Sequence, residues 1–212
     1  MDVRMFTVGP VQENCYILRR DGSDRALVVD PGDEADKLLN AIEALGLTID
    51  GILLTHTHFD HVGAVAPVAR ATGAEVWVPE LEKHVLADIN SHVRFPGFGP
   101  FESYEAEHTL SGGEKLELAG FEIDVLFTPG HSPGHVTYSI PDERAIFSGD
   151  VLFQGSVGRT DLPGGDWDTL LETIRSLMDT LPPETTVYPG HMGITTLAAE
   201  RATNPFLAEL AR

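Results

Sequence analysis

Three histidines and one aspartate lie within six consecutive positions, directly after the apolar run 51–54: His56, His58, Asp60 and His61. Imidazole and carboxylate groups bind dications such as zinc, and side chains at adjacent positions point in different directions, so this segment suits more than one metal ion. With 9 His in 212 residues, such a string is expected by chance in roughly one sequence in a thousand. The segment therefore favours a metal site over a histidine-rich surface loop.

Three more potential ligands stand at the ends of short strand-like runs: His131, Asp150 and His191. The run before His131 alternates apolar and polar residues and then breaks at a Thr-Pro-Gly sequence. Loops that follow strands in a layered α/β fold are common places for ligand sites. We therefore expect these side chains to meet the histidine-rich segment in space.

These motifs resemble the metallo-β-lactamase superfamily, and more closely its glyoxalase II-like hydrolases. The resemblance covers nearly the whole chain and rests on 55–61, Thr128-Pro129-Gly130-His131, Ser148-Gly149-Asp150 and Tyr188-Pro189-Gly190-His191. It implies one metal held by His56, His58 and His131, a second held by Asp60, His61 and His191, and Asp150 as the bridge between them. The chemistry leads to the same division, because a carboxylate has two oxygens for two cations whereas a neutral imidazole offers one nitrogen.

Two dications a few ångströms apart acidify a shared water toward a pKa of about 7, which creates a bridging hydroxide nucleophile. We expect two divalent ions, zinc first, with iron or manganese as alternatives, and we assign Asp60 and Asp150 as the catalytic carboxylates that hold them. Two zinc ions, two carboxylates and one hydroxide leave about one positive charge at the centre. An anionic substrate can therefore enter the site of an acidic protein.

The resemblance implies a hydrolase of small hydroxyacyl thioesters such as S-lactoylglutathione. Larger glyoxalase II enzymes carry an extra C-terminal helical domain that binds glutathione, whereas only 21 residues follow His191 here (212 − 191). We therefore expect the cleft of the metal-binding domain alone to hold the substrate, with a glutathione thioester as the leading candidate.

Several alternatives stay open within the same superfamily. A lactonase keeps the same seven ligands, and a persulfide dioxygenase binds one iron through the positions of His56, His131 and Asp150, a two-histidine, one-carboxylate face that suits Fe(II). A non-catalytic metal-binding module is a third class. Flavo-diiron proteins carry Glu at the position of His58, and dizinc β-lactamases commonly carry Cys at that of Asp150, which disfavours both.

The composition excludes several partners. With 14 Lys and Arg against 33 Asp and Glu, the formal charge is −19, which repels nucleic acids and anionic membranes. The N-terminal residues show no long apolar segment, and the lone Cys15 lies in an apolar run. We expect a cytoplasmic protein that acts on a small molecule, with Cys15 as a buried thiol. The sequence leaves the oligomeric state open.

Two segments are candidates for substrate recognition. Residues 89–107 hold four aromatic side chains among Pro and Gly, which suits a loop over a cleft or a loop anchored on the domain. In 151–166, Arg159 stands nine residues after Asp150, where related thioester hydrolases often place a Lys that grips a substrate carboxylate. Alternatively, Arg159 pairs with a nearby aspartate, Asp161 or Asp166.

Four histidines remain beside the expected ligands. His135 is a candidate for orienting a ligand, and Asp30 is a candidate for a hydrogen bond to a ligand histidine. We assign His84, His92 and His108 to no metal.

Apolar periodicity predicts an α/β fold, with one domain over residues 1–212. Strands are expected near 3–8, 14–19, 25–30, 50–54, 76–78, 114–118, 121–128, 135–140, 144–148 and 185–189. Helices are expected over 33–45, 63–72, 80–88 and 168–180, with a last helical stretch from 195 that resumes after Pro205. The resemblance arranges them as a four-layer αβ/βα sandwich with the metal site at one edge of its sheets.

Overall fold

The computed structural model describes residues 1–207 and contains two six-stranded sheets packed face to face between helices. The first sheet follows chain order: β1 (Asp2–Val8), β2 (Glu13–Arg19), β3 (Arg25–Val29), β4 (Thr48–Leu53), β5 (Val76–Pro79) and β6 (His108–Leu110). The second has the order β14 (Thr195–Thr196), β13 (Thr186–Pro189), β10 (Ala145–Gly149), β9 (Val136–Ile140), β8 (Phe121–Phe127) and β7 (Lys115–Leu118).

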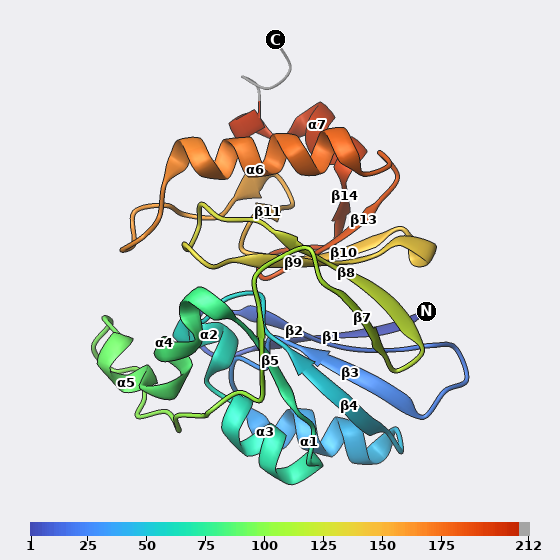
Figure 1. Ribbon diagram of the computed structural model, residues 1–212, viewed down its shortest axis with the longest axis vertical. Helices are drawn as coiled ribbons and strands as arrows, with labels where there is room; N and C mark the ends of the chain where they lie inside the picture. The colour runs from blue at the N-terminus through green and yellow to red at the C-terminus, as the bar shows by residue number, and fades with distance from the viewer. Residues whose placement is uncertain (208–212) are drawn as a thin grey trace.

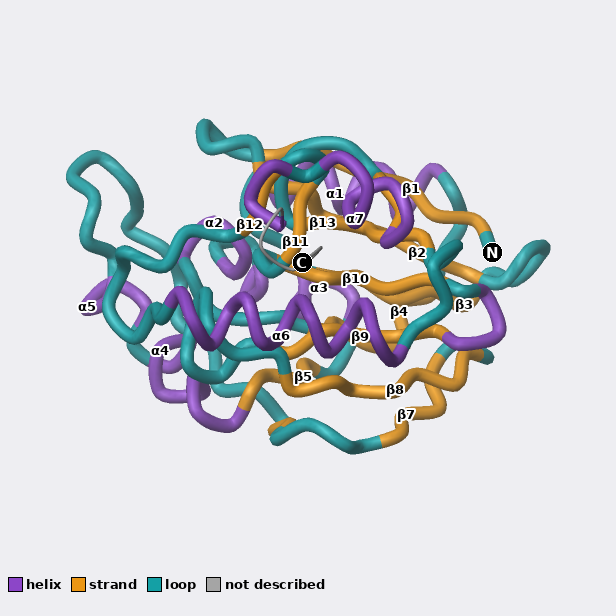
Figure 2. The backbone as a smooth tube through the Cα atoms, turned by 90° about the horizontal axis from the view of Figure 1, so that it is seen from above, coloured by secondary structure: helices purple, strands orange, loops and turns teal. Residues whose placement is uncertain are grey.

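Helices cover the outer face of each sheet (Figure 1). α1 (Ala35–Ala44) and α3 (Val65–Thr72) lie below the first sheet, and α6 (Trp167–Thr180) and α7 (Leu197–Thr203) lie above the second. Three short helices, α2 (Phe59–Val62), α4 (Lys83–Ala87) and α5 (Ile89–His92), lie at one side, as the view from above also shows (Figure 2). The small hairpin β11 (Leu152–Phe153) and β12 (Ser156–Val157) packs against α6. The predicted four-layer sandwich is confirmed.

Alternation along the strands produces the layers. In β3, Leu27 and Val29 pack between the two sheets, whereas Ala26 and Val28 pack against α1 and α3. Because both faces of the strand are buried, its sequence is a continuous apolar run. The cluster between the sheets contains the large side chains Tyr16, Phe121, Tyr138 and Phe147, and a third cluster lies under α6.

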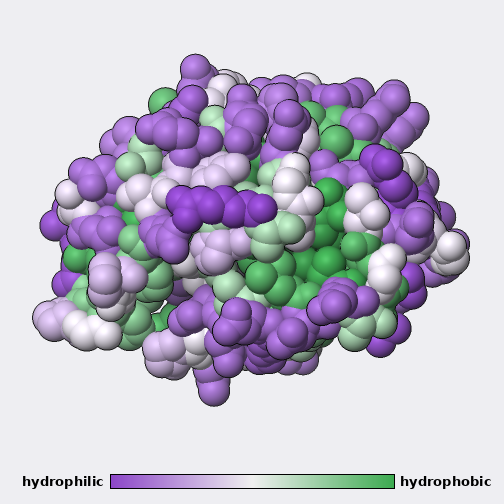
Figure 3. Space-filling view, turned by 90° about the horizontal axis from the view of Figure 1, so that it is seen from below, coloured by the Kyte–Doolittle hydropathy of each residue, from purple (hydrophilic) through white to green (hydrophobic). Residues whose placement is uncertain are grey.

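Hydrophilic residues dominate the underside of the molecule, over α1 and α3, with apolar residues exposed in one central area (Figure 3). Cys15 is fully buried, as predicted. Among residues 1–207, no helix is both long and apolar enough to span a bilayer.

The structure differs from the prediction at short elements. The helix expected over 63–72 is preceded by the separate turn α2, and the one expected over 80–88 begins as a 3-10 turn, Glu80–Glu82, before α4. The helix expected from Asp33 begins at Ala35, because Glu34 adopts a left-handed conformation with φ of 51°.

At the C-terminal side, Thr195–Thr196 pairs with β13 as β14, and the Thr196 side chain caps α7 by accepting a hydrogen bond from the amide of Ala199. After Pro205 the chain forms one 3-10 turn, Pro205–Leu207, and any continuation of the helical stretch predicted there lies outside the described residues.

Candidate metal centre

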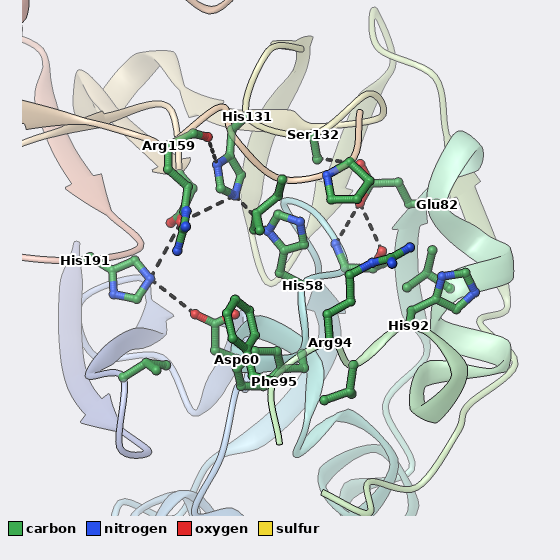
Figure 4. Close-up of a pocket in the computed structure, with 18 of the residues that line it drawn as sticks. His58, Asp60, Glu82, His92, Arg94, Phe95, His131, Ser132, Arg159 and His191 are labelled. Carbon is green, nitrogen blue, oxygen red and sulfur yellow. Dashed lines mark hydrogen bonds and ion pairs between the residues drawn. The ribbon is translucent and has the colours of Figure 1, made fainter. Parts of the chain in front are cut away.

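All seven predicted ligands meet at one edge of the sandwich, where strands of both sheets end. β4 is followed by His56 and His58, α2 carries Asp60 and His61, and β8, β10 and β13 are followed by His131, Asp150 and His191. Figure 4 shows His58, Asp60, His131 and His191 pointing toward one another from these separate loops. The structure therefore brings together every residue that the sequence assigned to the metals.

One group of ligands consists of His56, His58 and His131, whose ligand atoms all lie within 4.8 Å of one another. Nδ1 of His58 is 2.8 Å from Nε2 of His131. A second group consists of Asp60, His61 and His191, again within 4.8 Å. These are the two sets that the resemblance implies.

Asp150 lies between the two groups. Its Oδ1 is 3.3 Å from Nε2 of His61, and its Oδ2 is 3.5 Å from Nε2 of His131 and 3.6 Å from Nε2 of His191. The carboxylate thus contacts both sets at once, which fits the predicted role as a bridge.

Unpaired buried atoms at the centre indicate that these residues fit metal ions. Nε2 of His56, Nε2 of His61 and Oδ1 of Asp150 are buried and have no hydrogen-bond partner, although the last two atoms lie 3.3 Å apart. Buried polar atoms are almost always paired, because leaving one unpaired costs about 1–3 kcal/mol. Imidazole nitrogens and carboxylate oxygens are ligands for zinc, iron and manganese.

The protonation states of His56, His58 and Asp150 suit metal binding, whereas His61 holds its proton more strongly: burial opposes its charge, but Asp150 outweighs burial and raises the pKa of His61. Burial lowers the pKa of His56 well below its usual value, and burial together with His131 lowers the pKa of His58 to about 4. Burial opposes ionisation of Asp150, but the charges of His61 and His131 outweigh it and lower the pKa of Asp150. Neutral imidazole and ionised carboxylate are the forms that bind a dication.

The predicted hydrogen bond between Asp30 and a ligand histidine is confirmed, with the Asp30 carboxylate as the acceptor. Oδ2 of Asp30 is 3.0 Å from Nδ1 of His61 and accepts a 2.6 Å hydrogen bond from Oγ1 of Thr55, while Oδ1 accepts from the Thr55 amide at 2.8 Å. Asp30, His56 and His61 also form a third close group, but the oxygens of Asp30 are already engaged. Asp30 therefore orients His61 so that Nε2 faces the centre.

His135 supports Asp150 in the way that the sequence suggested. Nε2 of His135 accepts a hydrogen bond from the backbone amide of Asp150 at 3.1 Å, so its proton is on Nδ1, which lies 3.0 Å from Oγ1 of Thr128. Burial lowers the pKa of His135 well below its usual value. A neutral His135 therefore fixes the backbone from which Asp150 projects.

Glu82 is a functional residue that sequence reasoning missed. It is buried, and its Oε2 accepts from the amide and the hydroxyl of Thr57 at 2.8 and 3.0 Å. Its Oε1 accepts from the Ser132 hydroxyl and, at 2.9 Å, from the amide of Gly134. One carboxylate thus ties the loop of His58 to the loop of His131 (Figure 4).

We expect Glu82→Gln to weaken metal binding at the His56, His58 and His131 group by about 10- to 100-fold, the usual effect of losing a group that orients a ligand. The amide turns an NH₂ donor toward groups that are donors themselves. Competition with a fluorescent chelator measures the metal dissociation constant. Glu80→Gln is the matched control, because Glu80 is an exposed residue of the same 3-10 turn and binds Ser111. Equal loss in both variants would contradict this role.

Arg159 lines the cleft at the centre, but its side chain is engaged elsewhere. Its guanidinium donates to both carboxylate oxygens of Asp161 at 2.6 and 2.7 Å, which is one of the two ion pairs considered above. Asp166 instead caps α6 by accepting from the amide of Thr169 at 2.8 Å. The backbone carbonyl of Arg159 accepts from Nδ1 of His131 at 2.7 Å, so the main chain orients a ligand.

The aromatic loop has both of the roles considered for it. Ring centroids of Phe59 lie 4.8 Å from Phe98 and 6.0 Å from Phe95, and all three rings line a cavity of about 650 Å³ that also reaches the ligands. Phe101 stacks on Phe59 with ring centroids 5.9 Å apart, and Tyr104 packs against the core cluster. Part of the loop thus anchors it, and part forms the wall of a cleft.

Comparison with known proteins gives a consistent result. A family model described as the metallo-β-lactamase superfamily matches residues 8–191. A probable metallo-hydrolase of Bacillus subtilis, YqgX, is 43% identical over 98% of both chains. A hydroxyacylglutathione hydrolase of Haemophilus influenzae, GloC, is 36% identical over 98% of both chains.

Two solved structures are similar over nearly the whole chain. The B3 metallo-β-lactamase BLEG-1 has a TM-score of 0.92 and 40% identity, covering 98% of this chain and all (100%) of the other. TTHA1623 in a di-iron-bound form has a TM-score of 0.86 and 43% identity, covering 96% of this chain and 100% of the other.

Proposed function

The chain belongs to the metallo-β-lactamase superfamily and is a metallo-hydrolase, and from its site we propose that it is a dinuclear hydrolase of small hydroxyacyl thioesters. The observation that carries the proposal is the buried cluster in which Asp150 contacts two ligand groups beside an open cleft. The similarity to a hydroxyacylglutathione hydrolase supports the substrate class.

We propose two divalent ions, held by the residues divided as described above, with Asp60 and Asp150 as the catalytic carboxylates. Zinc suits the donor set, and the di-iron form of TTHA1623 supports a count of two and makes iron the alternative. When bound, the ions would supply a Lewis acid for the substrate carbonyl and lower the pKa of bound water.

The exposure of the ligands defines the side from which a substrate approaches. The side chains of His56 and His61 are fully buried, whereas those of Asp60 and His191 are 16% and 20% exposed. Asp60 and His191, with His58 beside them, therefore face the cleft (Figure 4). The reacting carbonyl would lie against this face, while the buried histidines and Asp30 keep the ligands in place.

The carboxyl groups that line the cleft suit a thioester better than an amide. Among the described residues, the acidic side chains that line the cleft are Asp60, Asp150 and Glu82. The oxygens of Glu82 accept hydrogen bonds from Thr57, Ser132 and Gly134. No spare carboxylic acid is therefore placed to protonate a departing amine. A thiol with a pKa of about 8.5 leaves as the thiolate and needs no such proton donor.

Hydrolysis of β-lactams is a second candidate. The observation that favours it is the similarity to the B3 metallo-β-lactamase BLEG-1. The chemistry also begins with attack on a carbonyl, but the leaving group is an amine. A substrate panel therefore separates the two candidates.

We expect purified protein to contain about two metal ions per chain by elemental analysis, as two ligand groups require. Chelation should abolish hydrolysis of S-lactoyl thioesters, and zinc should restore it. In the panel, kcat/KM for the thioester should exceed that for the matched oxygen ester, a lactone and a cephalosporin. A single iron per chain, with oxygen consumption on a persulfide, would overturn this assignment in favour of the dioxygenase.

A further inference from the structure

We propose that the cleft contains a second recognition point, at which Arg94 binds the carboxylate end of a substrate whose middle part is apolar. The inference deepens the proposed function and rests on it, because it places the reacting carbonyl at the metal centre. It names the substrate class by its shape: an apolar body between a thioester and a terminal anion.

The first observation is the unpaired charge of Arg94. In a protein with a formal charge of −19, most described cationic side chains pair with a carboxylate: Arg4, Arg19, Arg20, Arg25, Lys37, Arg70, Lys115, Arg144, Arg159 and Arg201. Arg94 lines the cleft and makes neither an ion pair nor a hydrogen bond with the residues described. Its guanidinium fork is thus available to a carboxylate.

The second observation is the position of Arg94. Figure 4 places its guanidinium on the side of the cleft that holds His92 and Glu82, with His58 between it and His191. The ring of His84 contacts that of His92 with centroids 5.5 Å apart, and both line the cleft. Glu82 makes no ion pair with Arg94 among the described residues, and its oxygens accept hydrogen bonds from the two ligand loops.

The third observation is the apolar surface between the two points. The rings of Phe59, Phe95 and Phe98 contact one another along one wall, and the apolar side chains of α4 and α5 continue it: Val85 and Ile89. A peptide body such as that of glutathione would leave its amides unpaired against this wall, which costs free energy. An aromatic or aliphatic body would bury apolar surface there instead.

The contrast with Arg159 makes Arg94 the better candidate. Both residues line the cleft, but the Asp161 carboxylate already compensates the charge of Arg159 by accepting two hydrogen bonds from its guanidinium. Binding a substrate at Arg159 would break that pair. Arg94 requires no such exchange.

The test is a binding measurement on the metal-loaded protein with 4-(mercaptomethyl)benzoate and its neutral analogue 4-(mercaptomethyl)benzamide. The thiolate of each probe anchors at the metal centre, the ring lies on the phenylalanine wall, and only the benzoate carries a terminal charge. Calorimetry should show that the wild type prefers the benzoate by about fivefold, the upper effect of a charge pair at an exposed side chain such as Arg94. A biphenyl carboxylate and its amide, each with the same mercaptomethyl group, test a longer distance between the thiolate and the terminal carboxylate.

Arg94→Ala should reduce this preference to about twofold or less, and Arg94→Lys should keep part of it, because an ammonium retains the charge without the fork. Arg175→Ala is the matched control, since Arg175 is an exposed cation of α6 that makes no ion pair within residues 1–207. The control removes the same charge from the protein, so an effect of net charge alone would appear in both variants. Equal preference in wild type and Arg94→Ala for both spacings would overturn the proposal.

Two thioester series then locate the anion. In the first series the substrate carries its carboxylate on the acyl half, and in the second series on the thiol half. Each charged thioester has a neutral counterpart in which an amide replaces the carboxylate. KM should rise in Arg94→Ala for the charged member of one series, with kcat little changed, which is the signature of uniform binding. If no thioester is hydrolysed but the probe preference persists and depends on Arg94, the proposed function fails and the recognition point stands. If thioesters are hydrolysed but the probes show no preference that depends on Arg94, the recognition point fails and the proposed function stands.

Discussion

Replacing Asp150 with alanine is expected to remove hydrolysis almost completely and to lower kcat by more than about a hundredfold. About a hundredfold is the usual upper effect of losing a residue that only orients a metal ligand. Asp150 contacts His61, His131 and His191 at 3.3 to 3.6 Å, so its loss leaves both ligand groups one donor short. Any single histidine serves one group. We therefore expect Asp150→Ala to be more damaging than His58→Ala, with both activity and bound metal measured in each variant.

Asp161→Ala is the control for this experiment. Asp161 lies in the same segment, but it is exposed and pairs with Arg159. Exposed ion pairs contribute under about 1 kcal/mol, so the control should keep its two metal ions and nearly all of its activity. Near-normal thioester hydrolysis in Asp150→Ala with full metal content would refute a dinuclear mechanism.

The ligands could be predicted because their positions follow directly from local sequence. His131, Asp150 and His191 each come after a short apolar run, and such runs become strands whose ends meet at one edge of a sheet. The roles of Asp30 and His135 were predictable for the same reason, since both stand where a strand begins or ends.

Glu82 could not be predicted, because its partners are distant in sequence. Thr57 lies 25 residues away and Ser132 lies 50 residues away. In the sequence, Glu82 is one of two glutamates on a short polar turn and is indistinguishable from the exposed Glu80. Only packing of the two ligand loops around it removes it from water. The role of the Arg159 carbonyl could not be predicted either, because every residue has a backbone carbonyl and the sequence does not show which one meets His131.

Local sequence also limits how much of the fold could be predicted, because only the longer strands show a readable period. Alternation predicted long strands such as β8, where Phe121, Ile123 and Val125 are buried on one face. β6 has three residues and each strand of the β11–β12 hairpin has two, so no period can be read in them. Pairing of the two sheets came from the resemblance, because periodicity identifies a buried face but not the surface that covers it.

Gly190→Ala is expected to disrupt the centre although it changes no ligand. A Cβ at this position would overlap Oδ1 of Asp150 and would lie 2.7 Å from Cε1 of His61. The backbone cannot move away, because the Gly190 amide donates to the Gly149 carbonyl at 2.8 Å and its carbonyl accepts from the Asn14 amide at 2.7 Å. One methyl group would therefore displace the carboxylate that contacts both ligand groups.

We expect this substitution to lower bound metal below one ion per chain, to reduce kcat by about a hundredfold or more, and to cost about 1–3 kcal/mol of stability through overpacking. Elemental analysis, thioester kinetics and denaturant unfolding measure the three effects. Gly193→Ala is the matched control two residues beyond His191: its Cβ would meet only the far end of the Gln154 side chain, which is exposed and can rotate away. If Gly190→Ala retained two metals and normal turnover, the close packing of Asp150 and His61 around this glycine would have no part in holding the centre.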